Sequence, residues 1–343
     1  MKVDLPLHVP GEALGGVAQA ARRAEEAGMD GVSCSELSSD PILQLTVAAG
    51  ATSRVELLSN IVVAFARSPM TLAVQGRAIQ EYSDGRLILG LGSQIKPHIE
   101  RRFSMPWSAP AARMAEYISA LRTIWHSWET GEKLDFRGDF YSHTLMTPMF
   151  TPASRYPAPR VFLAAVGERM TETAGKVADG LLLHAFTTPR YLREVTLPAL
   201  ARGRGERPEA DVDVVSSTFV VSGRNEEEYE KSRRLVCAQI AFYGSTPAYL
   251  PVLALHGWGQ LGLELNRLSK QPDPDKWQRM GELITDDVLA EFALIGEPDS
   301  IGAAMAKQYG GIVGRYEVNT VGLPDPELAV AVARSVQRAA AAQ

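Results

Sequence analysis

The chain has 343 residues, of which 45% are hydrophobic and 22% charged, so it can bury a substantial core and is neither disordered nor fibrous. Its 35 basic and 40 acidic side chains give a net charge of −5, which provides no general attraction to nucleic acid or to an anionic membrane. The two cysteines, Cys34 and Cys237, cannot build a disulfide framework, and no apolar run suits a signal peptide or a membrane span, so we expect a cytoplasmic protein.

The first part of the chain alternates short apolar runs with longer segments rich in Ala, Arg and Glu. The pattern predicts strands at 3–9, 31–35, 55–63 and 86–91. Helices are predicted at 14–27, 40–53, 69–82 and 111–129. Gly28 follows the first predicted helix, at the position where a residue with left-handed backbone is favoured. Asp40 and Pro41 have the pattern of an N-cap followed by the first residue of a helix.

The same alternation continues in the second part of the chain. Strands are predicted at 161–165, 180–184, 212–222 and 313–320, and helices at 170–177 and from 327 onward. Eight parallel strands joined by helices predict an α/β fold of the (β/α)8 TIM barrel type. A doubly wound open sheet is the alternative, but it favours Gly-x-Gly-x-x-Gly after the first strand, where this chain has His8, Val9, Pro10 and Gly11.

Two segments interrupt the alternation, at about 136–159 and about 238–298. We interpret both as insertions at the C-terminal face of a single barrel domain that spans 1–343. The second insertion carries the side chains Phe242, Tyr243, Tyr249, His256 and Trp258. Long insertions on that face often act as lids, so we expect the second one to exclude water from the site.

Polar residues and glycines that follow the strands form the candidate site, because barrel active sites lie at the C-terminal ends of the strands. They are His8, Glu36, Asn60, Arg67, Gly92, Ser93, Gln94, Gly167, Glu168, Arg169 and His184. His8 and His184 could instead be partly buried and bonded to backbone, and Glu36 could pair with Arg67. Gly167 precedes a predicted helix whose free N–H groups favour a phosphate, although a plain helix start has the same pattern.

Metal and nucleophile chemistry lack their usual signatures. The six histidines contain no His-x-x-x-His pair and neither cysteine has a neighbour at ligand spacing, so we expect no metal site. No Gly-x-Ser-x-Gly elbow for a serine nucleophile occurs. We therefore expect the chemistry to belong to a bound organic cofactor.

Four stretches carry a resemblance to a known family: AEEAGMDG at 24–31, NIVVAFARSP at 60–69, SDGRLILGLG at 83–92 and VADG at 177–180. In this order and spacing they resemble the luciferase-like monooxygenase superfamily, the (β/α)8 flavin and deazaflavin oxidoreductases. The chain is most similar to the coenzyme F420-dependent branch. Several relatives have an Asp-His pair where this chain has Glu36 and Leu37, so the chain departs from the family pattern at the proton donor of the sugar-phosphate dehydrogenases.

The resemblance also assigns cofactor-binding positions. They are Ser35, Ser59, Asn60, Ile61, Gly92, Ser93, Gln94, Gly167, Glu168 and Arg169. Similar enzymes have a non-proline cis peptide behind the ring, which falls here on Asn60 and Ile61. The ends of strands two and four would contact the ring or the ribityl chain, and the loop 167–169 would hold the phosphate. The cations Lys96, Arg101, Arg102 and Arg169 suit the polyglutamate tail of F420.

The activity implied by the resemblance is hydride transfer between C5 of F420 and a small organic substrate. Glu36 or His8 would supply the proton, and His98, His184, Tyr243 or His256 would contact the substrate. One alternative is an FMN-dependent monooxygenase that uses dioxygen and a reductase partner. Another is a barrel that binds flavin without catalysis or is purely structural. Related barrels are often homodimers, and we expect no nucleic-acid or membrane partner.

Overall fold

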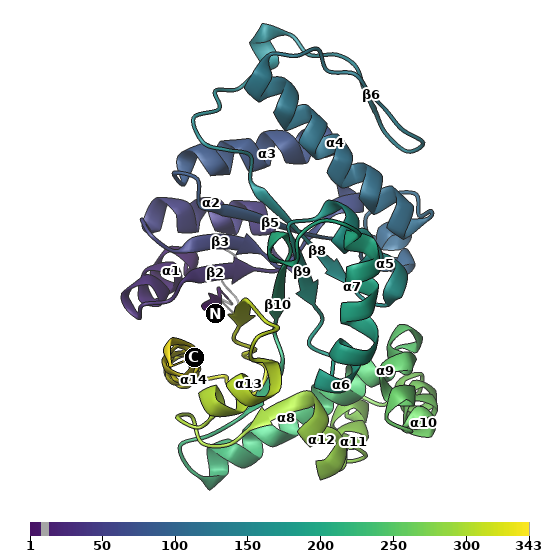
Figure 1. Ribbon diagram of the computed structural model, residues 1–343. Coiled ribbons are helices and arrows are strands. Elements are labelled where there is room, and N and C mark those ends of the chain that lie inside the picture. Colours follow the sequence, from purple (N-terminus) through teal and green to yellow (C-terminus); the bar gives the residue numbers. More distant parts are fainter. Residues whose placement is uncertain (8–13, 343) are drawn as a thin grey trace. The chain divides into compact units, whose positions relative to one another are not determined.

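A computed structural model describes residues 1–7 and 14–342, so the predicted role of His8 lies outside the described residues (Figure 1). The chain divides into two compact units. Unit 1 comprises Met1–Pro6, Leu183–Pro198 and Val214–Gln343, and unit 2 comprises Leu7–Leu182 and Ala199–Asp213. That the chain is a single domain stays a prediction. No helix in the described residues is long and apolar enough to cross a membrane.

The strands of unit 2 form a parallel sheet. They are β2 (Gly31–Cys34), β3 (Glu56–Ser59), β4 (Val62–Val63), β5 (Leu87–Gly92), β8 (Arg160–Ala165) and β9 (Gly180–Leu183). β2 pairs with β3, β3 with β5 and β5 with β8, while β4 also lies beside β5 and β9 is the next strand after β8. Every residue of β2, β5 and β9 is buried, as expected of strands that are covered on both faces. The predicted strand 55–63 is interrupted at 60–61, which separates β3 from β4.

Helices of unit 2 pack side by side in chain order beside this sheet (Figure 1). They are α1 (Val17–Glu26), α2 (Pro41–Ala51), α3 (Pro69–Tyr82), α4 (Pro110–Thr130) and α5 (Glu168–Val177). Each contacts the next one along the chain. The predicted start of α2 is confirmed, because the Asp40 carboxylate accepts a hydrogen bond from the Ile42 N–H at 2.8 Å and Pro41 opens the helix. Later in unit 2, α7 (Leu197–Arg204) and η5 (Glu209–Asp211) precede the next strand.

Unit 1 contains a second set of parallel strands. β13 (Arg315–Glu317) pairs with β1 (Lys2–Pro6) on one side and with β10 (Asp213–Ser216) on the other. The guanidinium of Arg315 donates to both oxygens of Asp4, at 2.7 and 2.6 Å, and both side chains are almost completely buried. A separate small sheet pairs β11 (Phe219–Val221) with β12 (Ala293–Ile295). The predicted strand 212–222 was therefore wrong as one element: it is two strands in two sheets.

The two predicted insertions contain structure of their own. The first holds a two-stranded hairpin of β6 (Phe136–Arg137) and β7 (Ser142–His143), followed by the short turn η3 (Pro148–Phe150). The second begins within helix α8 (Glu226–Gly244), and its other elements are η6 (Pro247–Tyr249), α9 (Leu250–Leu255), α10 (Gly259–Ser269), α11 (Lys276–Gly281), α12 (Asp286–Phe292) and β12. These helices share a buried core with Phe186, Phe219 and Ile240. A lid function for this segment stays a prediction.

The remaining helical elements are η1 (Ala64–Ala66), η2 (His98–Arg102), α6 (Pro189–Tyr191), η4 (Leu192–Thr196), α13 (Ile301–Tyr309) and α14 (Pro326–Ala341). Along the described chain, β1, β2, β3 with β4, β5, β8, β9, β10 and β13 are separated by helices. This is the connectivity of a (β/α)8 barrel, as the sequence predicted.

Candidate functional site

Hydrogen bonds join the end of β2 to the segment between β3 and β4. The Asn60 N–H donates to the Cys34 carbonyl at 2.8 Å, and the Ser35 Oγ donates to the Asn60 carbonyl at 2.7 Å. The Glu36 N–H donates to the Ile61 carbonyl at 3.2 Å. The peptide bond between Asn60 and Ile61 is cis, which confirms the position that the resemblance implied. Ser35, Glu36, Asn60 and Ile61 therefore belong to one local structure.

Glu36 is held by an ion pair. Its side chain is only 7% exposed, and Arg67 Nη1 donates to its two carboxylate oxygens at 3.0 and 2.8 Å. The Val63 N–H donates to Oε2 at 2.8 Å, and Arg67 Nη2 reaches Asp40 at 2.9 Å. Burial alone would lower the pKa of Arg67, but the hydrogen bonds and charges of Glu36 and Asp40 have the larger effect. The pKa of Arg67 is therefore raised. The pairing considered from the sequence is confirmed, and proton donation by Glu36 stays a prediction.

The two glycines of β5 allow close packing against the segment 59–61. The Ser59 hydroxyl donates to the Gly90 carbonyl and accepts from the Gly90 N–H, both at 2.9 Å, and Ser59 is fully buried. A Cβ on Gly90 would lie 1.9 Å from the Ser59 carbonyl oxygen, and one on Gly92 would lie 2.8 Å from the Ile61 side chain. Gly90 is therefore required by the protein's own packing, a Cβ on Gly92 would require the Ile61 side chain to shift, and the Ser59 hydroxyl donates one and accepts one hydrogen bond within the protein.

Ser93 and Gln94 continue the chain beyond the end of β5. Gln94 has a φ of 59°, a left-handed conformation that non-glycine residues seldom adopt. The Ser93 hydroxyl donates to the Gln94 carbonyl at 3.1 Å, and the Gln94 side chain accepts from the Ile95 N–H at 3.0 Å. Both residues are half-buried, so they remain accessible at the end of the strand. Unusual backbone of this kind is concentrated at ligand-binding turns.

Gly167 and helix α5 form an open helix start. Gly167 has a φ of 78° and provides no side-chain cap, and no atom lies within 4 Å of the point where a Cβ would stand. The first N–H groups of α5 therefore point toward an uncapped end, where the helix dipole favours an anion. Glu168 pairs with Arg202 at 2.5 Å, whereas exposed Arg169 has no ion-pair partner among the described residues.

In unit 1, His184 follows β9 and lies between two tyrosine rings. Its ring centroid is 4.5 Å from that of Tyr243, edge to face, and 4.7 Å from that of Tyr249, stacked. The Phe186 N–H donates to Nδ1 at 3.0 Å, which leaves the proton of the neutral ring on Nε2. Burial lowers the pKa of His184 to about 4, so the ring is neutral at physiological pH. Two of the predicted substrate residues, His184 and Tyr243, are thus brought together.

The other two predicted substrate residues are placed differently. His98 is exposed on η2 in unit 2. His256 stacks on Trp258 with ring centroids 4.7 Å apart, and its Nε2 lies 2.8 Å from the Thr188 hydroxyl. Burial lowers the pKa of His256, and the nearby carboxylate of Glu291 opposes that shift in part. His256 therefore already has hydrogen-bonding and stacking partners within unit 1.

A buried aromatic group on α4 was missed by sequence reasoning. Tyr117 is fully buried and its hydroxyl has no hydrogen-bond partner among the described residues. Its ring meets that of Tyr141 edge to face, with centroids 5.4 Å apart, and Arg113 donates to the Tyr141 hydroxyl at 2.8 Å. Burial raises the pKa of Tyr117 strongly, so the phenol stays protonated. The helical spacing of Tyr117 is that of any core residue, so no sequence signal distinguished it.

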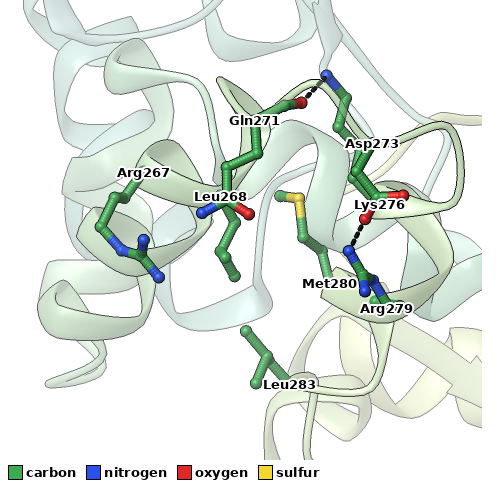
Figure 2. A pocket seen from close by; sticks show the side chains of 8 residues that line it. All are labelled: Arg267, Leu268, Gln271, Asp273, Lys276, Arg279, Met280 and Leu283. Atoms are coloured by element: carbon green, nitrogen blue, oxygen red, sulfur yellow. Dashed lines mark hydrogen bonds and ion pairs between the residues drawn. The ribbon is translucent and has the colours of Figure 1, made fainter.

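A cavity of about 340 Å³ lies in unit 1 between α10 and α11 (Figure 2). Its lining residues are Arg267, Leu268, Gln271, Asp273, Lys276, Arg279, Met280 and Leu283. None of them was predicted as a site residue. Their charges are satisfied locally: Arg279 pairs with Asp273 (Figure 2). Lys276 donates to the Ser269 carbonyl at 2.7 Å. Within residues 1–7 and 14–342, no cluster of His, Cys, Asp and Glu is arranged to hold a metal ion.

The sequence matches a known protein family and is similar to several known proteins. The family model of the luciferase-like monooxygenases matches residues 2–314. An uncharacterised protein of Mycobacterium tuberculosis is 52% identical over 301 residues, which cover 87% of this chain and 88% of that protein. A putative coenzyme F420-dependent oxidoreductase of the same organism is 25% identical over 304 residues, with 84% and 86% of the two chains covered.

Solved structures resemble the fold along its length. The coenzyme F420-dependent tetrahydromethanopterin reductase from Methanopyrus kandleri matches with a TM-score of 0.80 at 19% identity, over 98% of both chains. The oxygenating constituent of 3,6-diketocamphane monooxygenase from Pseudomonas putida, in complex with FMN, matches with a TM-score of 0.64 at 16% identity, over 99% of this chain and 98% of that one. The fold class is therefore the predicted (β/α)8 TIM barrel.

Proposed function

We propose, because the chain belongs to the luciferase-like monooxygenase family, that it is an oxidoreductase that binds coenzyme F420 and exchanges a hydride with a small organic substrate. The F420-dependent relative at 25% identity supports this choice of cofactor. When bound, a deazaflavin supplies a ring carbon that carries the hydride. The protein's part is to bind that ring, orient the substrate and exclude water.

The observation that carries the proposal is the open start of α5. Gly167 leaves space where a side chain would stand, and the N–H groups of the first helical turn have no side-chain cap. Exposed Arg169 adds a positive charge that no carboxylate among the described residues neutralises. Backbone N–H donors, the helix dipole and a guanidinium together suit a phosphate group, so the residues present fit the cofactor's phosphate.

For the ring, we assign the backbone of 60–61 and of 92–94, which lie in unit 2 with the start of α5. The left-handed Gln94 and the hydrogen-bonded segment at Asn60 provide two rigid stretches of backbone beyond the strands. That His184, which lies in unit 1, contacts the substrate stays a prediction; its neutral ring carries the proton on Nε2.

The experiment is a titration of the purified protein with F420 and with FMN in parallel, followed by quenching of cofactor fluorescence. We expect saturable binding of F420, and reduction or oxidation of bound F420 when a substrate is supplied. Saturable binding of FMN but not of F420 would refute the proposed cofactor and favour the alternative, an FMN-dependent monooxygenase. The FMN complex of a similar barrel supports that alternative. Binding of neither cofactor at high micromolar concentration would refute a flavin-type oxidoreductase.

A further inference from the structure

We infer that Glu36 and Arg67 are positioning residues: their ion pair fixes the backbone of 60–63 for cofactor binding, and Glu36 serves as a hydrogen-bond acceptor in that ion pair rather than as a proton donor. This inference rests on the proposed function, because it concerns the segment assigned to the cofactor ring. It gives Glu36 a role different from the one that the resemblance implies.

The contacts around the Glu36 carboxylate suit a group that accepts hydrogen bonds. Within residues 1–7 and 14–342, its hydrogen-bond partners are all donors: the Val63 N–H at 2.8 Å and Arg67 Nη1 at 2.8 and 3.0 Å. A protonated carboxyl group needs an acceptor for its hydrogen, and none of these contacts provides one. The side chains of Glu36 and Arg67 are 7% and 13% exposed, so loss of either charge leaves the other poorly solvated.

The ion pair also holds both backbone groups of Val63. Glu36 accepts from the Val63 N–H, while Arg67 Nη1 donates to the Val63 carbonyl at 3.3 Å. Two residues earlier, the Ile61 carbonyl accepts from the Glu36 N–H at 3.2 Å. Glu36 and its partner therefore bind backbone groups on both sides of Val62, and displacement of the carboxylate frees the Val63 N–H from its side-chain acceptor.

The second Nη group of Arg67 is held by another carboxylate, that of Asp40. Asp40 accepts from Arg67 Nη2 at 2.9 Å through Oδ2, and its Oδ1 caps α2 at the Ile42 N–H. The guanidinium is thus fixed between the end of β2 and the start of α2. The planar guanidinium presents its donors in a fixed geometry and so binds both carboxylates at once. A flexible lysine ammonium at position 67 would do so less well.

The test compares Glu36→Gln and Arg67→Met with the matched control Glu56→Gln. Glu56 also pairs with an arginine in unit 2, Arg160 at 3.0 Å, but it lies at the start of β3 rather than beyond the end of a strand. We expect each of the two test variants to raise the Kd for F420 about tenfold or more, which corresponds to about 1.4 kcal/mol, with turnover retained at saturating F420. The double variant should bind F420 no more weakly than either single variant does. Glu56→Gln should bind F420 as tightly as the wild type does.

A proton-donating Glu36 gives the opposite pattern. Glu36→Gln would then bind F420 normally and lose turnover at every cofactor concentration, and Arg67→Met would not reproduce its defect. That result would overturn the inference while leaving the proposed function intact, because the wild type would still bind and use F420.

Hydrogen exchange of the protein without cofactor provides a readout that does not depend on the proposed function. We expect peptides that contain Val63 to exchange at least several-fold faster in Glu36→Gln and in Arg67→Met than in the wild type, with no change in Glu56→Gln. Arg67→Lys is the milder variant if Arg67→Met folds poorly, and it should show an intermediate rate. Unchanged exchange at Val63 in both test variants would overturn the inference even if no cofactor bound to the wild type.

Discussion

Replacement of Gly90 by alanine should destabilise the protein severely. The new Cβ would lie 1.9 Å from the Ser59 carbonyl oxygen and 2.9 Å from Leu182 Cδ1, so β3 and β5 would have to separate. Overpacking of a buried site costs about 1–3 kcal/mol, and weakening of the two hydrogen bonds between Ser59 and Gly90 adds about 1 kcal/mol each. We therefore expect a loss of about 3–5 kcal/mol.

The assay is thermal unfolding followed by circular dichroism, in parallel with Gly259→Ala. Gly259 begins α10, has open space around a Cβ and lies outside the left-handed region, so its replacement should be neutral or slightly stabilising. At about 2 °C per kcal/mol for a chain of this size, Gly90→Ala should lower Tm by about 6–10 °C. A Tm within about 1 °C of the wild type would refute the close approach of Ser59 to Gly90.

Three further outcomes are expected. Arg169→Ala should raise the Kd for F420 about fivefold to tenfold and reduce its salt dependence, measured by fluorescence titration. His184 should remain neutral down to about pH 4 in an NMR titration of its ring protons. Its pKa in the folded protein lies below the unfolded value of about 6.5. Its contribution to stability is therefore complete above about pH 6.5 and declines as the pH falls toward 4. Arg315→Met should cost about 3–5 kcal/mol in denaturant unfolding because Asp4 stays buried, whereas Arg160→Met, at a partly exposed ion pair, should cost less than about 1 kcal/mol.

Much of the fold was predictable because strands and helices alternate with clear local patterns. The helix 69–82 is observed with the predicted bounds, and the capped start of α2 lies at Asp40. The prediction of one strand at 212–222 was wrong, because β11 pairs with β12 more than seventy residues later. An apolar run does not specify which distant strand it will join, so the small second sheet could not be read from local sequence.

The sequence predicted which candidate residues follow the ends of the strands but not the contacts that these residues make. The polar groups after β2, β5 and β8 followed from the barrel interpretation, whereas the choice between a free Glu36 and one paired with Arg67 depended on how α2 and the 60–63 segment approach each other. Gly90 lies within the strand predicted at 86–91, and only the tertiary structure shows that a glycine is required there for contact with Ser59. Tyr117 had no signal at all, because its buried hydroxyl is defined only by its surroundings.

The most direct measurement is a crystal structure of the protein with F420 bound. We expect the cofactor phosphate within hydrogen-bond distance of the first N–H groups of α5 and of Arg169, and the ring against the backbone of 60–61 and 92–94. A cofactor held elsewhere, for example in the cavity lined by Arg267 and Lys276 with these backbone segments untouched, would contradict the assigned site.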